Sequence, residues 1–179
     1  MTAPTLRVLV AEDEPHLGVL VEECLRGRGL EVVLVRDGGE AAARLAAERY
    51  DVALLDVQMP VADGLVVLDG ARALADPPEV IVVTGNAAGH AAVEALRRGA
   101  YAHVAKPYRM AEVELVVRRA GEKRALRAEV AALRAELRAL RGGGAASPDA
   151  GGRSGGPAGG DDGGSEGASH AVQPGPPTG

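Results

Sequence analysis

The stretch Val8-Leu9-Val10-Ala11-Glu12-Asp13-Glu14-Pro15 decides the fold class, because a short apolar run in it ends abruptly in three acidic side chains. A continuous apolar run rich in Val is typical of a strand that is buried on both faces. Pro15 follows at a position that suits the first turn of a helix. The stretch therefore predicts a buried strand that passes through an acidic turn into a helix.

The same alternation recurs along the chain. Further apolar runs occupy residues 32–35, 52–55, 80–83 and 102–105, and segments with helical periodicity lie between them at 14–28, 39–48, 65–74 and 91–98. Because the strands are apolar throughout and alternate with helices, we expect an α/β fold, a five-stranded parallel sheet doubly wound with helices on both faces. Ligands of such sheets bind beyond the carboxyl ends of the strands.

Composition excludes several classes of protein. The chain has no Phe, no Trp and only three Tyr, so it offers no aromatic platform for nucleic acid bases. Cys24 is the only cysteine and cannot form an internal disulfide. No signal-peptide or membrane-span pattern is visible, so we expect a cytoplasmic protein that does not associate with a membrane.

The C-terminal part differs from the rest in pattern and charge. A helical pattern runs from Met110 to about Arg141, and residues 106–141 carry ten basic and five acidic side chains, whereas residues 1–105 carry nine basic and sixteen acidic ones. Residues 142–179 are dominated by Gly, Pro, Ala and Ser, which cannot offset the entropy of ordering. We therefore divide the chain into a globular domain at 5–122, a helical extension at 123–141 and a disordered tail at 142–179.

The helical extension carries large apolar residues at alternating spacings of four and three: Leu126, Val130, Leu133, Leu137 and Leu140. This spacing predicts a short parallel two-stranded coiled coil, and so a homodimer through Leu126–Leu140. The alternatives are a seam for the helix of another protein, or an amphipathic extension that folds back on its own domain.

Polar residues follow four of the predicted strands. Glu12 and Asp13 follow the first strand, and Asp56, Thr84 and Lys106 lie at the ends of the third, fourth and fifth. Each residue alone is commonly a turn former or a surface charge. Together at one sheet edge they predict a single site, where clustered carboxylates favour a divalent cation. Mg²⁺ fits best, with Asp13 and Asp56 as direct ligands and Glu12 acting through water.

Four separated motifs at this edge carry a family resemblance. They resemble receiver domains of bacterial response regulators in order and spacing, over roughly residues 5–122: Val10–Pro15, Asp56–Gly64, Val83–Gly85 and Gly99-Ala100 with Lys106-Pro107. The resemblance implies a flavodoxin-like strand order and a phosphoryl group accepted by Asp56 from a sensor histidine kinase or a phosphotransfer protein. It further implies a Mg²⁺ site made by Glu12, Asp13, Asp56 and the backbone carbonyl of Gln58, phosphoryl contacts from Thr84 and Lys106, and a cis Lys106-Pro107 bond.

The resemblance also implies a conformational switch. In the family, Thr84 moves toward the phosphoryl group and an aromatic residue three positions before the lysine takes the vacated space. That position is His103 here, where the family normally has Tyr or Phe. Tyr101 is two residues earlier, and we do not expect it to take this role. The alternative for His103 is a plain surface residue of the strand.

The segment from Thr84 to Tyr101, with 119–124, resembles receivers of the NtrC type, which usually continue into an ATPase and a DNA-binding domain. Residues 142–179 contain neither a phosphate-loop motif nor a helix-turn-helix pattern. The chain is thus either a receiver that acts through protein contacts, or a fragment or relative of a DNA-binding transcription activator. A receiver-like scaffold that is never phosphorylated is a further alternative.

Two other classes of function fit less well. The basic residues of the extension are interspersed with Glu and lack a base-reading framework, so we expect no specific nucleic acid binding. A hydrolase with an aspartate nucleophile would normally have a second acid where this chain has Gln58. We therefore expect no enzyme, apart from the slow self-hydrolysis of the phosphoaspartate that the resemblance implies.

Overall fold

The computed structural model describes residues 5–85 and 89–142, and within them five parallel strands form one sheet in the order β2-β1-β3-β4-β5. The strands are β1 (Arg7–Ala11), β2 (Glu31–Val35), β3 (Val52–Asp56), β4 (Glu79–Thr84) and β5 (Ala102–Ala105). The helices are α1 (Pro15–Arg26), α2 (Gly38–Ala47), α3 (Gly64–Arg72), α4 (Gly89–Arg97) and α5 (Met110–Gly142).

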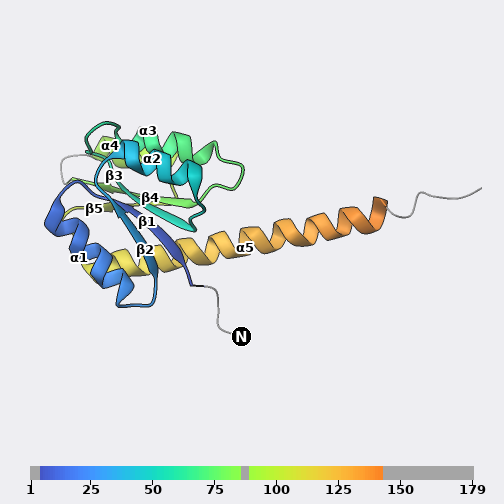
Figure 1. Ribbon diagram of the computed structural model, residues 1–179. Helices are drawn as coiled ribbons and strands as arrows, with labels where there is room; N and C mark the ends of the chain where they lie inside the picture. Colours follow the sequence, from blue (N-terminus) through green and yellow to red (C-terminus); the bar gives the residue numbers. More distant parts are fainter. Residues whose placement is uncertain (1–4, 86–88, 143–179) are drawn as a thin grey trace, which may run out of the picture.

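The helices cover both faces of the sheet. Figure 1 shows α2, α3 and α4 on one face, and α1 with the first part of α5 on the other. This confirms the predicted fold class, and the observed strand order is the flavodoxin-like one. From β1 the chain adds β2 on one side and then β3, β4 and β5 on the other, so the strand order reverses between β1 and β3. The carboxyl ends of these two strands border the crevice where ligands of such folds bind.

The core has two halves, one on each face of the sheet, built from aliphatic side chains and one tyrosine, Tyr50. Leu55 and Val82 face α2, α3 and α4, whereas Leu54 and Val83 face α1 and α5. Every residue of β3 is buried, which explains why its sequence is apolar without alternation until Asp56. A charged residue that ends such a strand therefore lies partly inside the protein.

Local signals set the helix starts. The Asp37 carboxylate accepts a hydrogen bond from the Glu40 N–H at 2.8 Å, and the Asp63 carboxylate accepts one from the Leu65 N–H at 2.7 Å. These are N-caps, and they fix where α2 and α3 begin. Helix α1 ends at Arg26, two residues before the predicted end, in a turn where Gly29 has φ of +80°.

Helix α5 runs without a break through Gly121, the only predicted weak point. Gly121 is buried, and a Cβ there would lie 2.3 Å from the Leu6 side chain, so glycine allows α5 to approach the start of β1 closely. Gly142, expected to open the tail, is instead the last residue of α5, and the predicted tail from residue 143 onward lies outside the described residues. No helix in the described ranges is long and apolar enough to cross a membrane.

Gly64 lets α3 begin directly against the end of β3, because a Cβ there would lie 2.1 Å from the Asp56 carbonyl oxygen. We expect Gly64→Ala to destabilise the domain by about 1 to 3 kcal/mol, since the backbone at Asp56 would have to move. Gly70→Ala is the control: it lies in the same helix with open space around it. That control should stabilise the domain by about 0.5 to 1 kcal/mol. Urea unfolding measures both, and equal effects of the two substitutions would contradict the close approach.

Candidate functional site

The predicted site residues meet at one edge of the sheet. Glu12 follows β1, Asp56 ends β3, Thr84 ends β4 and Lys106 follows β5. One carboxylate oxygen from each of Glu12, Asp13 and Asp56 lies within 4.8 Å of the others. The parallel topology brings these ends together because every strand points the same way.

Lys106 joins two of the three carboxylates. Its Nζ donates a hydrogen bond to Glu12 Oε1 at 3.0 Å and forms a second, short hydrogen bond to Asp56 Oδ2. Glu12 is 3% exposed and Asp56 is 5% exposed, so both are nearly removed from water. A buried carboxylate is costly unless it is paired, and one ammonium group here serves two of them.

The second oxygen of Asp56 is also bound. Oδ1 accepts a hydrogen bond from the Gln58 N–H at 2.9 Å, and the Gly64 N–H donates to the Val57 carbonyl at 3.0 Å, which folds the connecting loop back on the strand end. The Asp56 carboxylate is therefore held in one orientation by contacts on both oxygens. Gln58 lies at the site as predicted, while the assignment of its carbonyl to a metal stays a prediction.

Burial and charge shift two pKa values at this site. Burial raises the pKa of Glu12 above its usual value, and repulsion from Asp56 adds to this, although the hydrogen bond from Lys106 opposes it. Burial lowers the pKa of Lys106, but its hydrogen bonds to Asp56 and Glu12 outweigh burial, so the net shift is upward. Lys106 therefore stays charged, and Glu12 binds a proton more readily than an ordinary glutamate.

The acidic cluster fits a small divalent cation. Its donors are carboxylate oxygens, the ligands that Mg²⁺ prefers, and Asp13 is exposed, which leaves room for the waters that Mg²⁺ retains. A bound cation would neutralise the same Glu12 and Asp56 carboxylates that Lys106 contacts. The cluster is thus able to hold Mg²⁺, and Lys106 would compete with the metal ion for the Glu12 and Asp56 carboxylates.

Thr84 and His103 lie on the same face of the sheet. Thr84 is buried and pairs in register with Ala105 of β5. His103 lies two residues before Ala105, and residues two apart in a strand point to the same face of the sheet. His103 is exposed on the edge strand β5. Tyr101 packs against the opposite half of the core, because it lies before β5 and does not follow the alternation of that strand. The placement suits the switch, and the switching role of His103 stays a prediction.

Tyr108 borders the site and was missed in the sequence analysis. It follows the Lys106-Pro107 bond, which is cis as predicted, and lines a pocket of about 350 Å³ with Glu14, Leu17, Lys106 and Pro107. Burial raises the pKa of Tyr108 to about 12, and the negative charge of Glu12 acts in the same direction. The only signal in the sequence is its position directly after Lys106-Pro107.

Comparison with known proteins agrees with this geometry. The response regulator receiver domain family matches residues 8–118. The regulatory protein AtoC of Escherichia coli is 32% identical over 124 residues, which cover 69% of this chain and 27% of AtoC. The transcriptional regulatory protein PrrA of Mycobacterium tuberculosis is 34% identical over 125 residues, which cover 68% of this chain and 53% of PrrA. The chain thus spans only part of the length of these relatives.

The NtrC-type resemblance is also supported. The DNA-binding transcriptional regulator NtrC of Salmonella typhimurium is 34% identical over 113 residues, which cover 63% of this chain and 24% of NtrC. The solved receiver domain of NtrX from Brucella abortus is 31% identical with a TM-score of 0.61, and the match covers 64% of this chain and 98% of that one. The matched part of the relatives is their receiver. The chain therefore belongs to the response regulator receiver domain family of two-component signalling proteins.

Proposed function

We propose that the protein is a phosphorylation switch in which Asp56 accepts a phosphoryl group from a sensor histidine kinase or a phosphotransfer protein. The observation that carries the proposal is the contact of Lys106 with both Asp56 and Glu12. A cation placed against the carboxylate at the end of the central strand β3 is suited to offset the charge of an incoming phosphoryl group. Family membership supports the same function, since phosphorylation on aspartate is its general property.

The chain's own residues supply mainly positioning and charge. In the proposed step an Asp56 carboxylate oxygen forms a bond to phosphorus while the bond from phosphorus to the donor breaks, and the donor keeps the electron pair. Phosphoryl transfer of this kind needs alignment and charge neutralisation more than covalent chemistry. The Gln58 N–H fixes Asp56 Oδ1, and Lys106 would turn from a carboxylate toward the phosphoryl oxygens.

Mg²⁺ is the proposed cofactor, held by Asp13 and Asp56 directly, by Glu12 through water and by the Gln58 carbonyl. When bound, it would neutralise charge on the phosphoryl oxygens. The Thr84 hydroxyl and Lys106 are proposed to contact the phosphoryl group. Movement of Thr84 would then reach His103 on the neighbouring strand, because the two lie on one face of the sheet.

The output of the switch is proposed to be a change in protein contacts. We propose no enzymatic turnover beyond slow hydrolysis of the phosphoaspartate, and no specific binding to nucleic acid by the described part of the chain. The proposed partners are the phosphoryl donor and a second copy of the chain, the latter through Leu126–Leu140. A specific observation favours a second reading, a fragment of a DNA-binding activator: the matched relatives AtoC and NtrC are about four times longer than the matched segment.

Asp56→Asn should abolish phosphorylation, because the amide cannot replace the carboxylate oxygen as nucleophile. The measurement is incubation with acetyl phosphate and Mg²⁺, followed by intact mass and acid lability of the product. Asp51→Asn is the matched control, since Asp51 lies before β3 at the opposite end of that strand and should leave labelling unchanged. Labelling of the Asp56→Asn variant, or labelling that persists without Mg²⁺, would disprove the assignment.

Lys106→Ala should destabilise the Mg²⁺-free domain, because it leaves Glu12 and Asp56 buried without their shared cation. Saturating Mg²⁺ should recover much of the loss in melting temperature, and Mg²⁺ affinity should equal or exceed that of the unsubstituted chain. The variant should also signal poorly in a reporter assay, since the ammonium contacts the phosphoryl group. Arg109→Ala removes an exposed cation nearby and serves as control. Weaker Mg²⁺ binding by Lys106→Ala would show that Lys106 does not compete with the metal.

Mg²⁺ binding should weaken as the pH falls below neutral. The pKa of Glu12 is raised, so its protonated form gains population at a higher pH than for an ordinary glutamate, and that proton opposes the metal. Calorimetric titration with MgCl₂ measures the effect. Glu12→Gln should bind Mg²⁺ more weakly at neutral pH and show a flatter pH dependence. An equally steep dependence in that variant would assign the titration to another group.

A further inference from the structure

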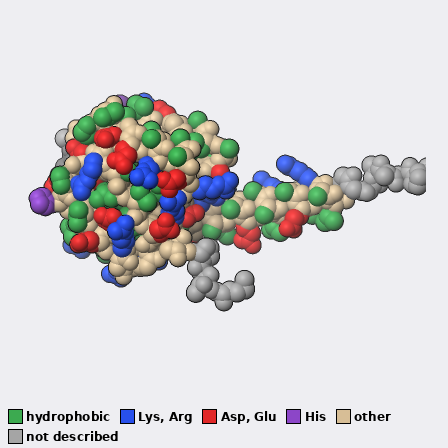
Figure 2. All heavy atoms as spheres, viewed as in Figure 1, with side chains coloured by type: hydrophobic (Ala, Val, Ile, Leu, Met, Phe, Trp, Pro, Cys, Tyr) green, Lys and Arg blue, Asp and Glu red, His purple; other side chains and the backbone are tan. Residues whose placement is uncertain are grey.

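The C-terminal half of α5 carries an apolar face without a partner in the described structure. The face consists of Leu126, Val130, Leu133, Leu137 and Leu140, whose exposed fractions run from 44% to 77%. Figure 1 shows this part of α5 projecting from the globular body, and Figure 2 shows hydrophobic side chains along it. A single projecting helix of this length is marginal in water, and a continuous exposed apolar face marks a surface of interaction.

This apolar face points away from the chain's own receiver. Val117 and Ala120 of α5 are buried against the sheet. Leu126 follows Val117 by nine residues, which at 3.6 residues per turn places it half a turn around the helix. In this structure the extension therefore does not fold back on its own domain. Helix α5 would have to rotate about its axis to bury the apolar face against the receiver.

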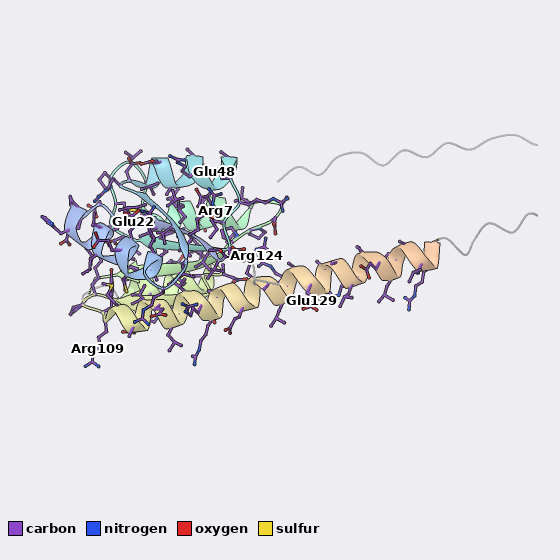
Figure 3. The ribbon with its side chains drawn as sticks, turned by 60° about the horizontal axis from the view of Figure 1, so that its bottom comes forward. Arg7, Glu22, Glu48, Arg109, Arg124 and Glu129 are labelled. Carbon is purple, nitrogen blue, oxygen red and sulfur yellow. The ribbon has the colours of Figure 1, made fainter. Side chains whose placement is uncertain are left out.

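A cluster of ion pairs fixes that rotation where α5 leaves the sheet. Glu79, at the start of β4, is 1% exposed, and its carboxylate lies 3.1 Å from Lys123 Nζ and 2.8 Å from Arg127 Nη1. Arg127 also donates to the Pro77 carbonyl, and Arg124 pairs with Asp76. Figure 3 labels Arg124 at this junction and Glu129 on the projecting part. We call this cluster the Glu79 clamp.

The clamp also sets where pairing can begin. In the heptad that places Leu126 at d, Lys123 falls at a and Arg119 at d, so the apolar seam does not continue toward the receiver. Lys123 and Arg127 are already held by Glu79 within the chain. The first residue free to pack across a helix pair is therefore Leu126.

The charges beside the seam identify its partner. Glu129 and Glu136 fall at g, and Arg134 and Arg141 fall at e, so each Glu faces an Arg five residues later on a second parallel copy. The residue four positions after each Glu on its own helix is a leucine, so pairing at that spacing within one chain does not explain the placement. In an antiparallel pair, g would face g and e would face e, which sets like charges together.

We propose that two copies of this chain associate through a parallel two-stranded coiled coil that begins at Leu126, with the Glu79 clamp holding each receiver on the outer side of the pair. Val130 at an a position with Leu at the d positions favours two strands over three. Because the receiver packs on the opposite face of α5, the two domains do not obstruct the seam. The association does not depend on phosphorylation of Asp56, so its failure would remove the proposed homodimer but leave the proposed phosphoryl transfer untouched.

Sedimentation velocity of the full chain tests the seam. At tens of micromolar the chain should run as a dimer, and Leu133→Glu with Leu137→Glu should run as a monomer. Both leucines are more than half exposed, so the receiver should stay folded, which circular dichroism checks. Ala132→Glu with Ala139→Glu adds the same two charges to the same helix off the seam and should remain dimeric. A monomeric unsubstituted chain, with and without Mg²⁺ and acetyl phosphate, would overturn the proposal, as would a dimer that survives the double substitution.

A charge exchange tests the proposed pairing across the seam. The variant with Glu129→Arg and Glu136→Arg should be monomeric alone, and so should the variant with Arg134→Glu and Arg141→Glu, because like charges face each other in each homodimer. Mixing the two variants should restore a dimer. Homodimers as strong as that of the unsubstituted chain in both variants would exclude these charges from the interface.

A crosslink tests the orientation. In a Cys24→Ala background, Leu140→Cys should form a disulfide-linked dimer under mild oxidation, since residue 140 meets its own copy only in a parallel pair. In an antiparallel pair each d residue packs beside an a residue, so residue 140 would lie beside Val130 of the other copy, too far from the other residue 140 for a disulfide. Absence of the 140–140 crosslink, together with crosslinking between Val130→Cys and Leu140→Cys chains, would overturn the parallel arrangement.

Discussion

The sharing of one ammonium group by two buried carboxylates is the interaction on which the site depends. Glu12 and Asp56 come from strands that neighbour each other in the sheet, and Lys106 reaches them from the far edge strand. Neither carboxylate could be buried there without a cation, because an unpaired buried charge is far more costly than a paired one. The two carboxylates and the one ammonium group leave the site with a net negative charge. A divalent cation or a phosphoryl group that binds there would change this charge.

A third buried carboxylate, that of Glu79, lies at the opposite end of β4 from the acidic site. Strand β4 begins at Glu79, held by Lys123 and Arg127 of α5, and ends at Thr84 beside the acidic site. The strand thus connects the residue proposed to respond to phosphorylation with the residue that orients the projecting helix. A single continuous helix, α5, connects the core of the receiver to the proposed pairing seam, because it runs without a break to Gly142.

Much of this arrangement could be predicted from the sequence, because the strands are short apolar runs and the functional residues lie directly at their ends. Asp56 and Lys106 were placed correctly since parallel strands bring those ends to one edge. Glu79 was not singled out, because its partners are more than forty residues away and nothing local marks a buried acid at the start of a strand. Val61 adopts φ of +68°, which its β-branched side chain disfavours and no local signal predicts. Tyr108 became notable only when its pocket beside Lys106 was visible.

The proposed switch requires that Asp56 accepts the phosphoryl group, and that Lys106, Thr84 and Mg²⁺ contact that group. The most direct measurement is a crystal structure of the chain with MgCl₂ and beryllofluoride, a stable mimic of an aspartyl phosphate. We predict that beryllium binds to an Asp56 carboxylate oxygen, that Lys106 and Thr84 contact the fluorine atoms, and that Mg²⁺ binds to Asp13 and Asp56. Beryllofluoride bound to a different carboxylate, or an Asp56 still held by Lys106 under saturating conditions, would contradict it.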